Sequence, residues 1–212
     1  RRKIIIFYSI SSHKIFSYNP NAKIIIMLRN PIDRAFSHYL MDYRLGLISE
    51  SFEAIIKKKS KHKNAHLFYQ QYIEVSEYEK QIKRYLEIFG RESICFIDYE
   101  DFKNDTSGIV NSVFLFLGVN SDFQPYIRRK YNTYTAPKNE IIRHIYSLVV
   151  LRKILSVILP SNLAMSIRNL LFSNDNKPKI SDSTRSFLKK YFTTDVNELS
   201  KLLNKDFTKW IK

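Results

Sequence analysis

Short apolar runs alternate along this chain with longer segments that have helical spacing. Residues 23–28 form an apolar run without polar alternation, which is typical of a strand covered on both faces in a parallel sheet. Residues 93–97 form a second such run, and residues 4–8 predict a further strand. Strands that alternate with helices in this order predict a three-layer α/β domain with a parallel sheet.

Helical spacing dominates the remainder of the chain. Asn30 can cap a helix that begins at Pro31, and Gly90 and Gly118 are expected to end two later helices. From residue 140 onward the pattern is helical throughout, so the C-terminal part is expected to be mostly helical. The other expected helices are 13–18, 52–58, 72–89, 109–117, 141–159, 162–172, 182–192 and 196–203.

Length and composition limit the class of protein. A chain of 212 residues with 44% hydrophobic residues predicts a single domain, 1–212, with a sizeable core, and excludes the disordered class. Lysine and arginine number 35 against 20 aspartate and glutamate, giving a net charge of +15. That excess indicates an anionic partner, although a genome rich in A and T would account for part of the lysine.

The number of cysteines and the length of the apolar stretches indicate the cellular compartment. Cys95 is the only cysteine, so no internal disulfide can form, and we expect a cytoplasmic protein in which this thiol fills core space. No signal peptide is visible, and a start at Arg1 leads us to expect a piece of a longer protein. The longest apolar stretch, 145–160, is interrupted by Arg152 and Lys153 and is too short to span a bilayer.

The stretch KIIIMLRNPIDRAFSHYL, residues 23–40, joins a predicted buried strand to an arginine. Arg29 follows the carboxyl end of that strand, where open α/β sheets bind ligands, and its planar guanidinium suits a phosphate. Ser37, two turns into the next helix, can donate to the same phosphate. In the alternative interpretation, Arg29 forms an ion pair with Asp33 or Glu100 and Ser37 is only a small spacer. The chemistry of these residues alone does not decide between a phosphate site and this ion pair.

This stretch resembles the 3′-phosphate-binding segment of sulfotransferases that use 3′-phosphoadenylyl sulfate (PAPS). Arg-Asn-Pro, then Asp-Arg-Ala, then a serine eight residues after the arginine is similar to that family position by position, above all to its heparan-sulfate-type and bacterial carbohydrate branch. The resemblance implies that Arg29 and Ser37 bind the 3′-phosphate of the donor. Weaker likenesses cover most of the chain: Asn19–Lys23, Glu50–Glu53, Ser76–Phe89, Tyr99–Phe102, Phe116–Val119, and Leu199–Leu203 with Trp210.

The resemblance implies a P-loop-like sulfotransferase fold and transfer of a sulfuryl group from PAPS to a hydroxyl or amine. A carbohydrate is the expected acceptor, and no metal is required. In one respect the chain departs from the family, because none of its glycines stands in a turn followed by Lys-Ser or Lys-Thr. The loop that holds the 5′-phosphosulfate, with the catalytic lysine and a glutamate base, is therefore expected upstream of Arg1. No catalytic residue is assigned, and the chain alone is expected to be inactive.

Two later segments leave alternatives open. The family's late basic loop falls near 173–179, where only Lys177 and Lys179 supply positive charge. Lys177 is thus a candidate contact to the donor, with a solvent-facing loop as the alternative. The helices expected within 141–172 favour an accessory layer over the sheet, while their cations leave contact with an anionic membrane surface as a second interpretation.

Other candidate sites have simpler explanations. His62 and His66 stand four residues apart but lack a third ligand, so a surface loop is favoured over a zinc site. Asp98, Glu100 and Asp101 follow a predicted strand. For these acids we favour helix capping and a salt bridge to a nearby arginine over a paired-carboxylate site.

A basic nucleic-acid- or nucleotide-binding module without catalysis is the rival interpretation. The net charge, the run KKKSKHK at 57–63 and the abundant tyrosine favour it. The aromatic residues, however, have core spacing instead of forming a stacking platform, and no nucleic-acid-binding motif occurs. We therefore expect a sulfotransferase with an anionic nucleotide donor and no nucleic-acid partner.

Overall fold

The computed structural model describes residues 9–123, 135–148, 160, 163, 166–167, 170–173 and 178–212. These residues divide into two compact units that interleave along the chain. The first unit holds the described residues within 1–34, 73–129 and 186–212, and the second those within 35–72 and 130–185. The single domain over 1–212 stays a prediction.

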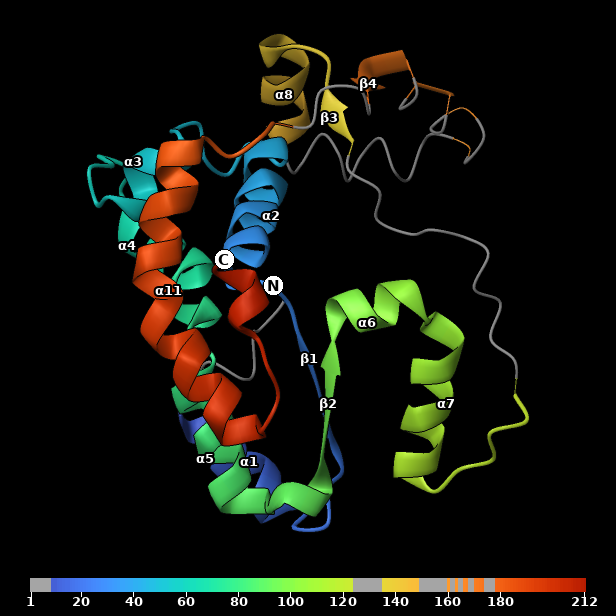
Figure 1. Cartoon of the computed structure of the whole chain (residues 1–212). Coiled ribbons are helices and arrows are strands. Elements are labelled where there is room, and N and C mark those ends of the chain that lie inside the picture. The colour runs from blue at the N-terminus through green and yellow to red at the C-terminus, as the bar shows by residue number, and fades with distance from the viewer. Residues whose placement is uncertain are drawn as a thin grey trace. The chain divides into compact units, whose positions relative to one another are not determined.

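The first unit is built around a parallel pair of strands (Figure 1). β1 (Ile24–Leu28) pairs with β2 (Ile94–Asp98), with Leu28 opposite Asp98. Both strands lie within one residue of their predicted bounds, because each apolar run is bounded by polar residues. The third predicted strand, 4–8, lies outside the described residues.

One expectation about β1, that both of its faces are covered, is not met by the described residues. Ile26 and Leu28 are buried, whereas Ile25 is 42% and Met27 is 47% exposed. Successive side chains of a strand point to opposite faces, and described residues cover only one face of this strand. The apolar run therefore leaves an apolar face open among the described residues.

Helices accompany the strand pair in the first unit. α1 (Ser9–Tyr18) contacts α5 (Glu79–Phe89), and the ring centroids of Phe16 and Phe89 lie 5.5 Å apart. Gly90 ends α5 with a φ of 76°, a left-handed conformation that glycine adopts without steric cost, as the sequence predicts.

The 3₁₀ turn η2 (Arg91–Ser93) precedes β2, and two helices follow it. α6 (Tyr99–Asn104) begins at once, and α7 (Thr106–Leu117) ends at Gly118, whose φ is 73°. The predicted end of this helix is confirmed. A last 3₁₀ turn, η3 (Thr208–Trp210), closes the chain.

The long helix predicted over 72–89 is wrong, because the chain breaks before α5. The 3₁₀ turn η1 (Glu74–Ser76) precedes the break, and α5 begins at Glu79. The carboxylate of Asp195 accepts hydrogen bonds from the backbone N–H of Tyr78 at 2.9 Å and of Glu79 at 3.0 Å. It thereby satisfies N–H groups that have no partner inside the helix.

Asp195 lies on α11 (Asp182–Leu203), one continuous helix where the sequence predicts two. The polar residues 193–195 interrupt the sequence pattern but not the helix, because the buried positions continue at helical spacing on either side of them. Those buried side chains are Leu188, Phe192, Val196 and Leu199.

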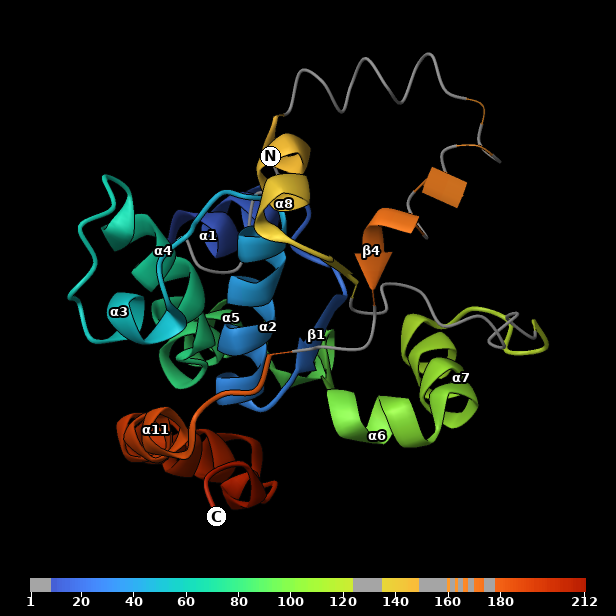
Figure 2. The same ribbon diagram turned by 90° about the horizontal axis from the view of Figure 1, so that it is seen from above.

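The second unit holds most of α2 (Pro31–Arg44), with α3 (Phe52–Ile56) and α4 (Ala65–Tyr72). Figure 2 shows α3 and α4 side by side, in agreement with their contacts. The predicted cap of α2 is confirmed, because Asn30 Oδ1 accepts a hydrogen bond from the backbone N–H of Ile32 at 3.0 Å.

An aromatic cluster forms the centre of the second unit, with centroids of neighbouring rings 5.2 to 6.2 Å apart. Its members are Phe36, Tyr39, Phe52, Phe68 and Tyr72. Beside the cluster, the Tyr72 hydroxyl donates to Asp42 Oδ2 at 3.0 Å, and burial raises the pKa of Asp42 to about 6.

The second unit also contains α8 (Glu140–Ser147) and an antiparallel pair, β3 (Ala136–Pro137) with β4 (Phe172–Ser173). The expectation that everything from residue 140 onward is helical is wrong at β4, whose backbone pairs with β3. Most of 149–169 lies outside the described residues. No helix in the described part of the chain is both long and apolar enough to cross a membrane.

We expect Asp195→Ala to lower the free energy of unfolding by about 1–2 kcal/mol, because two N–H groups at the start of α5 lose their acceptor. Urea denaturation at neutral pH measures the loss. The control is Thr194→Ala, which changes an exposed neighbour and should shift stability by less than about 0.5 kcal/mol. Equal losses would show that Asp195 does not cap this helix.

Candidate functional site

Arg29 lies where the sequence places it, directly after the end of β1. Its side chain is half-buried, and the guanidinium carbon lies 4.9 Å from the centroid of the Tyr99 ring in a cation–π contact. Tyr99 is the first residue of α6, immediately after β2. The arginine therefore occupies the carboxyl edge of the parallel pair, where ligand sites of open sheets form.

No carboxylate neutralises Arg29 among the described residues. The predicted alternative partners, Asp33 and Glu100, make no ion pair with it, and Glu100 pairs instead with Lys103 at 3.0 Å. Arg29 Nε is buried and has no hydrogen-bond partner in the described part of the chain. Arg44 Nε and Arg84 Nη1 are likewise buried without a partner among the described residues. What distinguishes Arg29 is its position at the carboxyl edge of the strands, where its Nε suits an acceptor supplied by a ligand.

Contacts from distant segments fix the turn from β1 into α2. The Tyr78 hydroxyl donates to the carbonyl of Arg29 at 2.9 Å, and Asn30 Nδ2 donates to the carbonyl of Trp210 at 3.1 Å. Burial raises the pKa of Tyr78 to about 12, so its hydroxyl remains a donor at neutral pH. The backbone that carries the arginine is thus held in place by α5 and η3.

Arg34, in the first turn of α2, is a second cation that the sequence analysis did not single out. Its Nη1 donates to the buried hydroxyl of Ser76 at 2.7 Å. Burial lowers the pKa of this guanidinium, and the positive charge of Arg29 also acts to lower it. The mutual effect of two like charges favours an anionic ligand near them. Arg34 belongs to the Asp-Arg-Ala triplet of the motif. Its position in the first turn of the helix, however, is equally typical of a residue that only packs against neighbouring elements.

Ser37 lies on α2, eight residues after Arg29, and its side chain is partly exposed. Its hydroxyl makes no hydrogen bond to another described residue. Ser37 belongs to the second unit and Arg29 to the first, so their joint role stays a prediction. Lys177, the third predicted contact to the donor, lies outside the described residues, and Lys179 is exposed. The unpaired guanidinium nitrogen of Arg29 by itself suits a phosphate oxygen.

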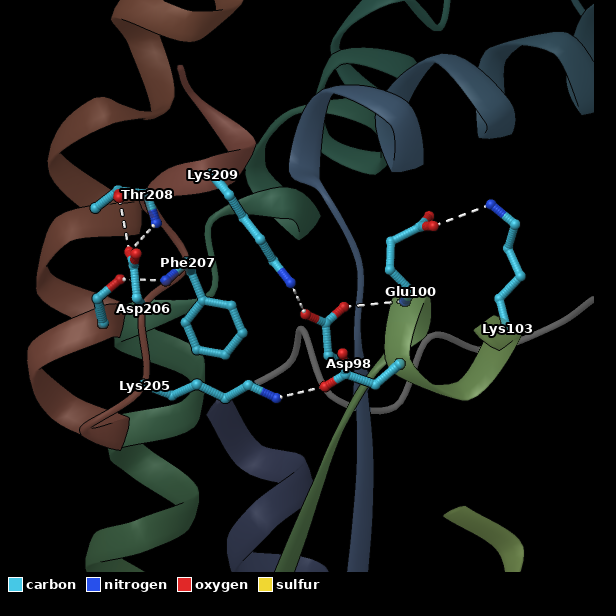
Figure 3. A network of polar contacts seen from close by, with 10 residues as sticks. Asp98, Glu100, Lys103, Lys205, Asp206, Phe207, Thr208 and Lys209 are labelled. Carbon is cyan, nitrogen blue, oxygen red and sulfur yellow. Dashed lines mark hydrogen bonds and ion pairs between the residues drawn. The ribbon is translucent and has the colours of Figure 1, made fainter. Parts of the chain in front are cut away.

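Asp98 anchors a cluster of charges at the end of β2 (Figure 3). Its carboxylate is fully buried, with Oδ1 accepting from the backbone N–H of Glu100 at 3.0 Å and Oδ2 lying 2.9 Å from Lys209 Nζ. The hydrogen bond to Asp98 raises the pKa of Lys209, which keeps this ammonium charged. A residue of η3 thus reaches the end of a strand far away in the sequence.

Two exposed ion pairs accompany this buried one. Lys205 Nζ lies 2.8 Å from Asp101 Oδ2 and lowers the pKa of that carboxyl, and Lys103 pairs with Glu100. The predicted capping role is confirmed by Asp98, but the predicted arginine partner is wrong, because each partner is a lysine. All three carboxylates are engaged separately, so they form no paired-carboxylate site.

Histidine and cysteine have structural roles in the described residues. His62 Nδ1 accepts a hydrogen bond from the backbone N–H of Asn64 at 3.1 Å, consistent with a surface loop. Across the described ranges, no group of three His, Cys, Asp or Glu side chains is placed to hold a metal ion. Cys95 is half-buried in β2, and burial raises the pKa of its thiol, which disfavours the reactive thiolate.

Comparisons with known proteins agree on one family. A family model described as "Sulfotransferase domain" matches residues 7–199. The bifunctional heparan sulfate N-deacetylase/N-sulfotransferase 1 of Caenorhabditis briggsae is 25% identical over 118 residues, covering 51% of this chain and 14% of that protein. The crystal structure of a sulfotransferase from Alicyclobacillus acidocaldarius matches with a TM-score of 0.67 at 26% identity, covering 98% of this chain and 64% of that one. This chain therefore spans less than two thirds of either relative.

We expect Asp98→Ala to lower the free energy of unfolding by about 2 kcal/mol, because its carboxylate both caps α6 and pairs with Lys209. The loss is smaller than for a fully buried pair, since Lys209 remains half-exposed. The matched control, Asp101→Ala, removes the exposed pair with Lys205 and should cost less than about 1 kcal/mol. Urea denaturation of both variants measures the difference, and similar losses would contradict the anchoring role of Asp98.

Proposed function

This chain belongs to the sulfotransferase domain family, and from that premise we propose that the intact protein transfers a sulfuryl group from PAPS to a carbohydrate hydroxyl or amine. The predicted fold class is confirmed as a mixed α/β sulfotransferase fold with a parallel sheet and a mostly helical remainder. The observation that carries the choice of donor is the buried, unpaired Nε of Arg29 at the carboxyl edge of that sheet. A guanidinium in this position suits the 3′-phosphate that distinguishes PAPS from simpler nucleotides.

Each site residue has a role in this proposal. Arg29 binds the 3′-phosphate as a charged donor, Ser37 adds a hydroxyl, and Lys177 adds a cation from the late basic loop. The hydrogen bond from Tyr78 orients the backbone of Arg29 before the donor binds, which lowers the entropy lost on binding. Binding at this remote phosphate helps to orient the sulfuryl end of the donor for in-line transfer.

The carbohydrate acceptor is supported by similarity and by charge. The relative from Caenorhabditis briggsae is named as a heparan sulfate N-sulfotransferase, and it shares 25% identity with just over half of this chain. A net charge of +15 suits a nucleotide donor and an acceptor that are both anionic. The rival proposal, a basic nucleic-acid- or nucleotide-binding module without catalysis, explains the charge and the unpaired Arg29 but not the match to the sulfotransferase family over residues 7–199.

Ligand-dependent thermal stability tests the donor site. Adenosine 3′,5′-bisphosphate should raise the melting temperature more than 5′-AMP, because only the former carries the 3′-phosphate. Arg29→Ala should weaken bisphosphate binding by about 2–3 kcal/mol, the scale of a lost charge-assisted contact. Calorimetry on the full-length enzyme gives the affinity directly.

A matched control exists on the same strand pair. Arg91 precedes β2 and stacks on Phe96 at 5.0 Å, as Arg29 stacks on Tyr99, but it lies at the amino end of the strands. Arg91→Ala should leave bisphosphate affinity unchanged, and Arg29→Lys should lose part of it because lysine lacks the planar fork. Unchanged affinity in Arg29→Ala would remove Arg29 from the donor site.

The chain of 212 residues should transfer no sulfate by itself, because it contains no glycine turn followed by Lys-Ser or Lys-Thr to hold the 5′-phosphosulfate. Release of adenosine 3′,5′-bisphosphate from PAPS, measured with a panel of polysaccharides, checks this expectation. Binding of the bisphosphate in the same preparation is the control for a folded site. Measurable turnover would show that a phosphosulfate site and a base lie within these residues.

A further inference from the structure

A loop rich in lysine joins α3 to α4 and has no part in the donor site. The lysine loop, defined as residues 57–63 with the sequence KKKSKHK, contains five lysines and no acidic residue. All five lysine side chains are exposed. The loop and both flanking helices belong to the second unit, so their mutual geometry lies within one compact body.

Little acidic charge opposes these lysines. Glu53 Oε1 lies 2.5 Å from Lys57 Nζ, and this hydrogen bond, with a smaller contribution from Lys59, lowers the pKa of Glu53. Lys59, Lys61 and Lys63 make no ion pair or hydrogen bond through their side chains to any described residue. The loop therefore presents positive charge to solvent that the described protein does not neutralise.

Backbone and side-chain hydrogen bonds keep this loop in one conformation. The N–H groups of Lys59 and Ser60 both donate to the carbonyl of Ala54, at 2.8 and 3.1 Å. Ser60 Oγ then accepts from the N–H of His62, and His62 Nδ1 accepts from the N–H of Asn64, each at 3.1 Å. Like charges repel and would spread an unrestrained segment, whereas these hydrogen bonds restrain the backbone that carries the lysines.

Lys58 adds backbone strain to the arrangement. Its φ of 55° lies in the left-handed region that non-glycine residues rarely adopt. In this conformation its ammonium lies 4.5 Å from the centroid of the Tyr69 ring. The N–H of Lys58 donates to the carbonyl of Ile55 and that of Lys59 to the carbonyl of Ala54, so this residue ends α3 in a Schellman motif that fixes where the loop leaves the helix.

We propose that the lysine loop is a docking surface for an anionic polysaccharide that carries sulfate or carboxylate groups. The choice of a carbohydrate rests on the proposed function, in which such a polymer is the acceptor. Lysine ammonium groups contact anions as point charges without a fixed planar geometry. A polymer with repeating anions can therefore bind this loop in several registers.

Other anionic partners fit this loop less well. Single-stranded nucleic acid binds on open aromatic faces, but Lys58 covers the ring of Tyr69, and Phe68 is buried with its ring 5.2 Å from that of His62. The loop contains no helix or two-stranded ribbon that could enter a DNA groove. It also lacks apolar residues for insertion into a lipid surface.

Two triple variants of the full chain test the proposal. The loop variant is Lys59→Gln, Lys61→Gln and Lys63→Gln. The matched control, Lys80→Gln with Lys83→Gln and Lys190→Gln, removes the same charge from exposed lysines on α5 and α11. The probe is immobilised heparin, with binding measured at several salt concentrations and neutral dextran as a blank. Thermal unfolding of both variants checks that each is folded.

We expect the loop variant to bind heparin about tenfold more weakly at physiological salt and to show a salt dependence shallower by about two to three units of slope. The control variant should change affinity by less than about twofold. Equal losses of heparin affinity in the two variants would show that only the net charge of the protein matters, and would overturn the proposal. So would loop-dependent binding to single-stranded DNA or anionic-lipid vesicles without loop-dependent binding to heparin.

Nucleotide binding separates this inference from the proposed function. The loop variant should bind adenosine 3′,5′-bisphosphate as the unchanged chain does, while Arg29→Ala should bind heparin as the unchanged chain does. A chain that binds heparin through the loop but shows no preference for the bisphosphate over 5′-AMP would refute the donor site and support the docking surface.

Discussion

A buried guanidinium nitrogen without an acceptor is the constraint on which the proposed donor site depends. Folded proteins pair nearly all of their buried donors, and a charged donor left unpaired is more costly than a neutral one. Arg29 is stabilised by the ring of Tyr99 but not neutralised by a carboxylate in the described residues. An anionic ligand that accepts from this nitrogen would lower the free energy of the folded protein. The cost of leaving the donor unpaired in the free protein would therefore favour binding.

The C-terminal segment holds the carboxyl ends of both strands. The carbonyl of Trp210 accepts from Asn30 just after β1, and Lys209 pairs with Asp98 at the end of β2. Asp195 on α11 fixes the start of α5, which in turn places Tyr78 against the carbonyl of Arg29. Neighbouring residues of one 3₁₀ turn thus link two strand ends, and the edge that carries Arg29 depends on residues far from it in the sequence.

The sequence predicted correctly those helix ends and strands that are determined by residues close to them in the chain. The two apolar runs gave β1 and β2, and the caps at Asn30, Gly90 and Gly118 were read correctly because each acts on its own backbone. The break within 72–89 was missed, because helical spacing continues through it and the acceptor that stabilises it, Asp195, is 117 positions from Tyr78. The face of β1 that the described residues leave exposed was missed for a related reason, since an apolar residue does not reveal what covers it.

The same distinction applies to the residues of the proposed donor site. A motif surrounds Arg29 and distinguishes it, whereas Arg34 and Tyr78 have residue types and spacing that core packing explains equally well. A buried, oriented guanidinium discriminates by geometry, and it favours one phosphate at one position. Exposed lysines instead attract over a distance, respond strongly to salt and discriminate little. An enzyme that transfers a sulfuryl group from one small donor to a long anionic chain needs both kinds of contact, and under the proposed function the excess charge of this protein would serve two separate purposes.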